Sequence, residues 1–248
     1  MNGGKRGEVR IVYGSSGRVL EEFMHRETFS EQAEGVARTV LADIRKKGDS
    51  AACAWIKRFD GVSLSPDRLR VRRDELAEAR KLVEPAFRRA TAESLARIEA
   101  FARASARKNW RMKTPWGGYV GEQFVPLDRV GVYVPGGAAP LASTALMTAS
   151  IAEVAGVREI VACTPCGKNG KINPHLLYAL DAAGATEIYR LGGIQAVGLM
   201  AYGAKIMRKV QKIVGPGGTY VTAAKRQVYG NVALDLVVIC LRKFLAHC

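Results

Sequence analysis

The sequence has no apolar run long enough to cross a membrane, and we expect no secretory leader. A membrane helix needs about 18 apolar residues, and the longest late candidate, Leu234 to Cys240, is roughly a third of that length. The first ten residues are rich in glycine and charge and lack the apolar stretch of a signal peptide. We therefore expect no membrane partner and a cytoplasmic protein.

Cysteine and histidine are scarce, with 5 and 3 residues among 248. An odd number of cysteines in a chain of this size excludes a disulfide framework and favours a reducing compartment. A catalytic zinc ion takes about three protein ligands, but His25, His175 and His247 lie far apart in the sequence. No metal ligand is therefore predicted, and His175 is expected to be a solvated surface residue.

Cys163 and Cys166 form a C-x-x-C pair. A redox dithiol normally opens a helix, whose N-terminus lowers the pKa of the thiol. Here the pair ends an expected strand, and a loop of Gly, Lys and Asn follows. Structural cysteines are the favoured interpretation, with a redox pair as the alternative.

Acidic residues are too few to balance the basic ones, and the formal net charge is +15. The basic excess is spread along the chain, and its densest cluster, residues 68–73, is flanked by Asp67, Asp74 and Glu75. No zinc finger, RNA-binding aromatic signature or basic zipper accompanies it. We therefore expect no specific nucleic-acid partner and rank nonspecific binding last. The charge also favours a small anionic ligand such as a dinucleotide.

The remaining composition, 48% hydrophobic and 25% charged residues, is that of a folded globular protein. Apolar spacing and capping residues predict a mostly helical lobe over residues 1–118. The expected helices are 30–47, 50–60, one capped by Asp74 that runs to about Val83, and one from Pro85 to about Lys108. In the last helix, Phe87, Leu95, Ile98 and Phe101 share one face. Trp110 and Trp116, at the junction that follows, are expected to be packing residues.

Residues 119–235 alternate between β-branched runs, glycine-rich loops and helices. Strands are expected at 130–134, 159–163, 187–189 and 210–214, with helices at 143–155, 174–184, 194–202 and 220–228. This pattern predicts an α/β fold: a Rossmann-like parallel sheet with right-handed βα crossovers. The loops would meet at the carboxyl edge of the sheet, where helix N-termini favour an anionic ligand. Neither the G-x-G-x-x-G fingerprint nor the phosphate loop is present.

Several segments, taken in order, resemble the histidinol dehydrogenase family. They are Val40–Arg45 with Gly48-Asp49, Phe59-Asp60-Gly61, Arg129–Gly137, Leu191–Ala196, Lys212–Gly217 and Ala224–Val228. The resemblance covers about residues 30–235, which correspond to roughly the first half of the family's length.

The resemblance implies an enzyme that oxidises L-histidinol to L-histidine with NAD and zinc, the last step of histidine biosynthesis. It also implies an intertwined homodimer, although the oligomeric state of this chain stays open. Tyr133 and Gln195 match NAD-binding positions of the family. The third such position is normally Asn in Gly-Pro-Gly-Asn and is Gly218 here, which weakens that contact.

The last segment, residues 236–248, departs from the family pattern after Asp235. We interpret it as the product of a shifted reading frame or a truncation, so no zinc ligand or acid/base residue is assigned. The chain alone is therefore predicted to be inactive. The alternative is a non-catalytic nucleotide-binding remnant or a degenerate gene product.

Lys225 and Arg226 would face either a phosphate or solvent, with neither option favoured.

Overall fold

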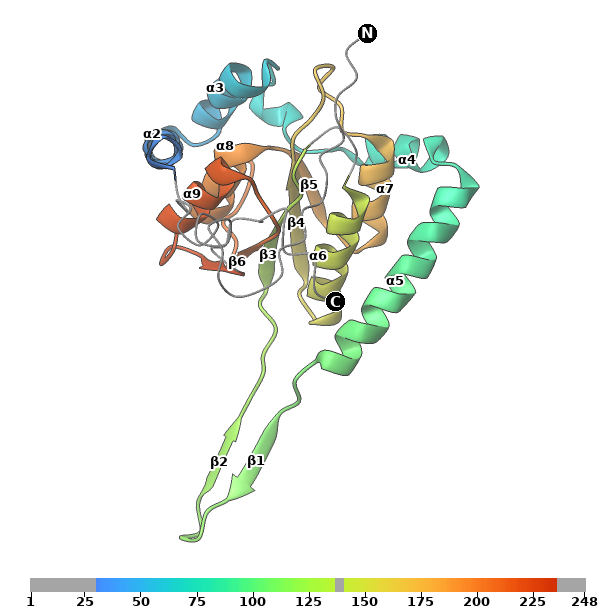
Figure 1. The fold of residues 1–248 in the computed structure, drawn as a ribbon, viewed down its shortest axis with the longest axis vertical. Helices are drawn as coiled ribbons and strands as arrows, with labels where there is room; N and C mark the ends of the chain where they lie inside the picture. The colour runs from blue at the N-terminus through green and yellow to red at the C-terminus, as the bar shows by residue number, and fades with distance from the viewer. Residues whose placement is uncertain (1–29, 137–140, 236–248) are drawn as a thin grey trace, which may run out of the picture.

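The computed structural model describes residues 30–136 and 141–235 (Figure 1). The predictions for His25, His247 and residues 236–248 lie outside the described residues. No helix of the described part is long and apolar enough to cross a membrane.

The centre of the fold is a five-stranded parallel sheet in the order β5-β4-β3-β6-β7. The strands are β3 (Arg129–Tyr133), β4 (Glu159–Thr164), β5 (Glu187–Arg190), β6 (Lys212–Val214) and β7 (Ala233–Leu234). The chain moves outward from β3 to β5 and then returns to the other side of β3, so the strand order reverses between β3 and β6. This confirms the predicted fold class. The strand expected from Val210 begins only at Lys212, because the Val210 amide donates to the carbonyl of Met200 instead of joining the sheet.

Helices cover both faces of the sheet (Figure 1). Helices α6 (Ala142–Val154) and α7 (Pro174–Ala182) follow β3 and β4, whereas α8 (Gly193–Tyr202) and α9 (Thr219–Gln227) follow β5 and β6. Alternate residues of one strand enter opposite cores: Val132 packs with α6 and α7, and Tyr133 packs with α8 and α9. This period of two is the geometry of a strand buried on both sides.

The N-terminal helices pack outside these layers. They are α2 (Glu31–Lys47), α3 (Asp49–Asp60), α4 (Arg73–Leu82) and α5 (Pro85–Ser105), with a short 3₁₀ turn, η1 (Pro66–Arg68), between α3 and α4. Helix α2 packs against α8 and α9, while α4 and α5 pack against α7 and α6. Because the cores therefore contain residues from both predicted domains, the N-terminal helices help to build the site at the sheet edge. The division at residue 118 stays a prediction.

The expected start of α4 was wrong. The helix begins at Arg73, one residue before Asp74. The Arg72 amide donates to the Glu75 carboxylate at 3.0 Å, which satisfies one N–H at the helix start. Asp74 instead forms an exposed ion pair with the Arg72 side chain.

The apolar face expected on α5 is only partly buried. Phe101 is 73% exposed, whereas the fully buried residues of this helix are Thr91 and Ala102. Helix α5 contacts α6 and α7 along one side, and Figure 1 shows it running along the outside of the fold. Phe101, which belongs to the predicted face, therefore stays exposed.

An antiparallel hairpin, β1 (Trp110–Lys113) and β2 (Tyr119–Glu122), was not predicted. Figure 1 shows that it projects away from the sheet and its helices. Trp110 is 48% exposed and Trp116 is 91% exposed, so the expectation that these two residues pack in the interior was wrong. The turn signal was Gly117-Gly118, where Gly117 adopts a φ of +84° that only glycine takes without strain.

Candidate nucleotide-binding site

The loops after β3 and β6 meet at the carboxyl edge of the sheet, where the strand order reverses. Gly215 follows β6 with a φ of +120°, and a Cβ at this position would lie 2.1 Å from the carbonyl oxygen of Tyr133. Only glycine allows the two backbones to approach so closely. Crevices at such reversal points are where open α/β sheets bind ligands.

Lys225 holds this loop in place. Its ammonium group donates to the Gly215 carbonyl at 3.2 Å and to the Asp235 carboxylate, which also accepts from the Gly215 amide at 2.8 Å. The Lys225 side chain is 5% exposed. Lys225 therefore does not face solvent, and that option was wrong; the phosphate option stays a prediction. Arg226 forms an ion pair with Glu34 of α2 at 2.7 Å.

Tyr133 ends β3 and is 4% exposed. Its hydroxyl accepts a hydrogen bond from the Gly193 amide at 3.1 Å, so it connects the end of β3 to the start of α8. Burial raises the pKa of this hydroxyl, which keeps it protonated and able to donate in turn.

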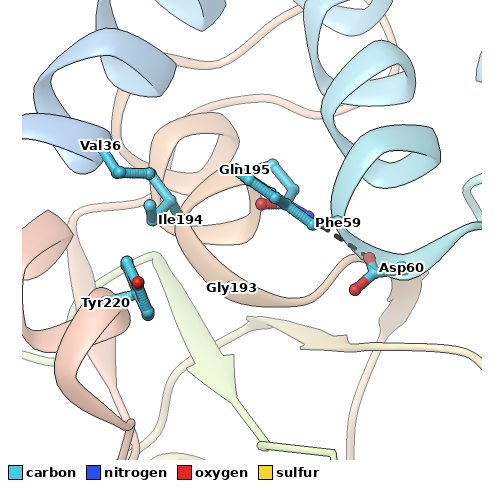
Figure 2. Close-up of a pocket in the computed structure, with 7 residues that line it drawn as sticks. All are labelled: Val36, Phe59, Asp60, Gly193, Ile194, Gln195 and Tyr220. Carbon is cyan, nitrogen blue, oxygen red and sulfur yellow. Dashed lines mark hydrogen bonds between the residues drawn. The ribbon is translucent and has the colours of Figure 1, made fainter. Parts of the chain in front are cut away.

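A cavity of about 340 Å³ opens beside the start of α8. Figure 2 shows its lining residues, which come from α2, α3, α8 and α9: Val36, Phe59, Asp60, Gly193, Ile194, Gln195 and Tyr220. Two aromatic side chains flank the cavity, and both remain partly exposed, Phe59 at 45% and Tyr220 at 46%. The remaining surface is apolar except at Asp60 and Gln195.

Gln195 is the buried polar group of this cavity, with 1% of its surface exposed. Its Nε2 donates to Asp60 Oδ2 at 3.4 Å, as the dashed line in Figure 2 shows. Its Oε1 has no hydrogen-bond partner among the described residues. Burial raises the pKa of Asp60, and the hydrogen bond from Gln195 partly offsets this effect.

Gly193 leaves room for the Gln195 amide. Its φ is +55°, and a Cβ there would lie 3.2 Å from Gln195 Oε1. Any side chain at this position would press on the unpartnered oxygen. Glycine at the first residue of α8 therefore lets the backbone approach this buried acceptor closely.

The structure brings two of the three predicted site residues together. Tyr133 and Gln195 meet around Gly193, whereas Gly218 is the exposed N-cap of α9, two residues before Tyr220. No atom lies within 4 Å of a Cβ built at Gly218. The sequence analysis placed Asp60 in the family-like segment Phe59-Asp60-Gly61 but predicted no role for it in the site.

Metal-ligating residues are dispersed in the described part of the chain: no three His, Cys, Asp or Glu side chains there could hold one ion. Cys163 is buried, Cys166 is half-buried, and both are free thiols whose pKa values are raised by burial. Thiols of this kind are poor nucleophiles. His175 is not simply a solvated residue: its Nε2 lies 2.8 Å from Glu84 Oε2, and its ring meets the Phe87 ring edge-on.

Comparison with known proteins decides which family carries this site. The sequence profile of the histidinol dehydrogenase family matches residues 24–238. The chain belongs to the histidinol dehydrogenase family.

Relatives in this family match the chain over most of its length. The histidinol dehydrogenase of Symbiobacterium thermophilum is 45% identical over 87% of this chain and 50% of its own length. That of Methanothermobacter thermautotrophicus is 44% identical over 88% of this chain and 51% of its own. The chain thus spans about half the length of the curated relatives it matches.

A solved histidinol dehydrogenase has the same fold. The crystal structure of the enzyme from Elizabethkingia anophelis matches with a TM-score of 0.81 and 35% sequence identity, covering 88% of this chain and 51% of that one. The expected resemblance to an N-terminal part of the family is therefore confirmed.

Proposed function

We propose that this chain forms the nucleotide-binding half of a histidinol dehydrogenase and binds NAD at the carboxyl edge of its sheet. The observation that carries the proposal is Gln195, a buried side chain that borders the cavity and whose Oε1, next to Gly193, has no partner among the described residues. A buried acceptor without a partner costs about 1–3 kcal/mol, and a ligand that donates to it recovers this cost.

The surroundings of Gln195 suit a dinucleotide. The N-cap of α8 is Gly192, which has no side chain to cap the first helical turn, and of the N–H groups there the Gly193 one donates to Tyr133. Such groups favour a negatively charged phosphate. Tyr133 fixes the position of Gly193, and Gly218 opens a second helix N-terminus near the cavity. When bound, NAD would supply the acceptor for a hydride.

The reaction of the family is the NAD-dependent oxidation of L-histidinol to L-histidine, and we propose this activity for the whole protein. The described residues offer no ligand set for the zinc ion that the family resemblance implies, so we assign no step through the metal to them. We expect these residues to bind NAD without oxidising histidinol. The homodimer of the family is likewise an expectation for the whole protein.

Calorimetric titration with NAD tests the proposal. The chain should release saturable heat, and Gln195→Leu, which removes the amide at similar volume, should weaken binding by about tenfold or more. Gln123→Leu, in the exposed segment after β2, is the matched control and should bind as the parent does. Absence of heat at millimolar NAD would refute the proposal.

A turnover assay tests the expectation that the chain alone does not oxidise histidinol. With histidinol, NAD and added zinc, the chain should form no NADH above background. Turnover near that of an intact relative would show that residues outside the described ranges complete the site.

A further inference from the structure

An ion pair holds both polar backbone groups of Gly215. The Lys225 ammonium group donates to the Gly215 carbonyl at 3.2 Å, and the Asp235 carboxylate accepts from the Gly215 amide at 2.8 Å. Lys225 also donates to the other oxygen of Asp235, so the two side chains fix each other. The peptide groups on both sides of Gly215 are therefore held in place, and with them its φ of +120°.

Burial alone does not explain a lysine at this position. Lys225 is 5% exposed and belongs to the buried face of α9, where an ammonium group loses its hydration. Attraction to a partner offsets this loss only in part, and an apolar side chain of similar size is often equally stabilising. What the lysine adds, and an apolar residue would not, is the contact with the Gly215 carbonyl and with Asp235.

Gly215 lies between two parts of the proposed nucleotide site. Its backbone packs against Tyr133 at the end of β3, and the Tyr133 hydroxyl accepts from the Gly193 amide at 3.1 Å. In the other direction the chain passes through Gly218 into α9, where Tyr220 lines the cavity of Figure 2. A shift of Gly215 would therefore displace both the end of β3 and the start of α9.

We infer that Lys225 and Asp235 are positioning residues of the nucleotide site: their ion pair fixes Gly215 against Tyr133 and so places the loop that leads into α9. Neither side chain has to touch the ligand to do this. The inference rests on the proposed function, because the affinity for NAD reports the positioning.

Calorimetric titration with NAD tests the role of Lys225. Lys225→Met has a side chain of similar length but no donor for the Gly215 carbonyl, so NAD should bind about tenfold more weakly. Arg129→Lys is the matched control, because Arg129 is a buried cation in an ion pair that opens β3 at the opposite edge of the sheet. This control should bind NAD within about twofold of the parent, since distant sites act independently.

Urea unfolding of the same two variants separates positioning from stability. Both variants should be less stable than the parent, because each changes a buried ion pair. Only Lys225→Met should also lose affinity for NAD. If the two variants weakened NAD equally, or if Lys225→Met bound NAD as the parent does, Lys225 would have a structural role alone and the inference would fail.

Variants of Asp235 provide a second test that does not depend on the folding of Lys225→Met. Asp235→Ala leaves the Gly215 amide without its acceptor and should weaken NAD about tenfold. Asp235→Asn keeps an oxygen that accepts from this amide and should stay within about threefold of the parent. Equal affinities of the two variants would overturn the positioning role of Asp235.

A ligand-free measurement keeps this inference separate from the proposed function. In nuclear magnetic resonance spectra, the Gly215 amide proton should exchange slowly with solvent in the parent and faster in Lys225→Met and Asp235→Ala. The amide of Val132, in the middle of β3 and paired on both sides, should keep its rate in all three. Unchanged exchange at Gly215 would overturn the inference. If NAD does not bind the parent, the proposed function and the effect on affinity both fail, while this measurement still decides whether the ion pair fixes Gly215.

Discussion

At the residue scale, the site depends on where side chains are absent as much as on where they are present. Gly215 and Gly193 leave space beside Tyr133 and Gln195. Gly218 is different: its φ is −74°, in the range open to every residue, and the space around it is empty. Nothing in the backbone there requires glycine.

Gly218→Asn should therefore be accepted without strain and should strengthen NAD binding. An Asn at this N-cap also satisfies an N–H of the first turn of α9, which stabilises the fold by a few tenths of a kcal/mol relative to Gly. A restored hydrogen bond to the ligand adds about 0.5–1.5 kcal/mol, a gain of roughly two- to tenfold in affinity. Calorimetry on the parent, Gly218→Asn and Gly218→Ala measures it. An equal gain with Ala would show that the Asn side chain makes no contact.

The sequence could predict Tyr133 and Gln195 because both lie in motifs that the family resemblance covers. Asp60 also lies in such a segment, Phe59-Asp60-Gly61, but its contact was not predicted. Only the packing of α3 beside α8 brings Asp60 to within 3.4 Å of Gln195. Such a contact between distant segments leaves no pattern in a single sequence.

At the element scale, buried arginines hold the strands and the N-terminal segments in register. Arg129 of β3 is 5% exposed and pairs with Glu159 of β4 and Glu187 of β5. Arg190 of β5 is also 5% exposed and donates to the carbonyls of Arg68, Arg70 and Gly170 and to Glu75. One guanidinium group thus joins the sheet to η1, α4 and the loop after β4.

Arg190→Lys should destabilise the protein by about 2–4 kcal/mol, because one ammonium group cannot reach the acceptors that a planar guanidinium satisfies together. Arg80→Lys is the matched control. Arg80 pairs with Asp181 but is 59% exposed, so its replacement should change the free energy of unfolding little. Urea unfolding measures both variants, and an equal effect would contradict the role of Arg190.

Stability should fall in acid because of Glu187. Burial alone would raise the pKa of Glu187, but hydrogen bonds from Arg129 and Tyr189 outweigh it and lower the pKa to about 2. A carboxyl with a lowered pKa stabilises the fold above its unfolded pKa, near 4.5, and loses this contribution as the pH falls toward 2. The loss amounts to about 3 kcal/mol at most.

Unfolding curves measured from about pH 6 to about pH 2, a range that spans both pKa values of Glu187, test this. Glu187→Gln should be less stable than the parent at pH 6, and the difference should shrink as the pH falls. Glu93→Gln, in an ion pair whose carboxylate is 70% exposed, is the control. A difference that stays constant down to pH 2 would contradict the account.

The helices and strands were largely predictable, since the spacing of apolar residues and the glycine-rich loops mark the elements from β3 to α9. The hairpin was not. Its strands, β1 and β2, are exposed at every residue and so carry no buried face for a hydrophobic pattern to reveal. Phe101 shows the converse: its spacing fits an apolar face of α5, but no neighbouring element covers that part of the helix.

At the scale of the whole molecule, a second and larger cavity lies between α6, β6 and the segment after β2. Its volume is about 780 Å³, and its apolar lining includes Met147, Ile151 and Val125, which are 51%, 45% and 71% exposed. Apolar surfaces of this kind promote association between molecules.

Ile151→Lys should lower the concentration-dependent aggregation of the chain without lowering its stability, because a charged side chain at this half-exposed position remains in water. Light scattering during concentration measures the effect. Leu82→Lys introduces the same charge at an equally apolar residue, 61% exposed at the end of α4, and should help much less. Equal improvement would show that net charge, not this cavity, controls aggregation.

The most direct test of the central claim, that NAD binds beside the start of α8, is to map its contacts by amide chemical shifts in the nuclear magnetic resonance spectrum. NAD should shift the amides of Asp60, Gly193 and Gln195 most strongly. Shifts confined to the larger cavity around Met147 and Ile151, or no shifts at all, would contradict the account.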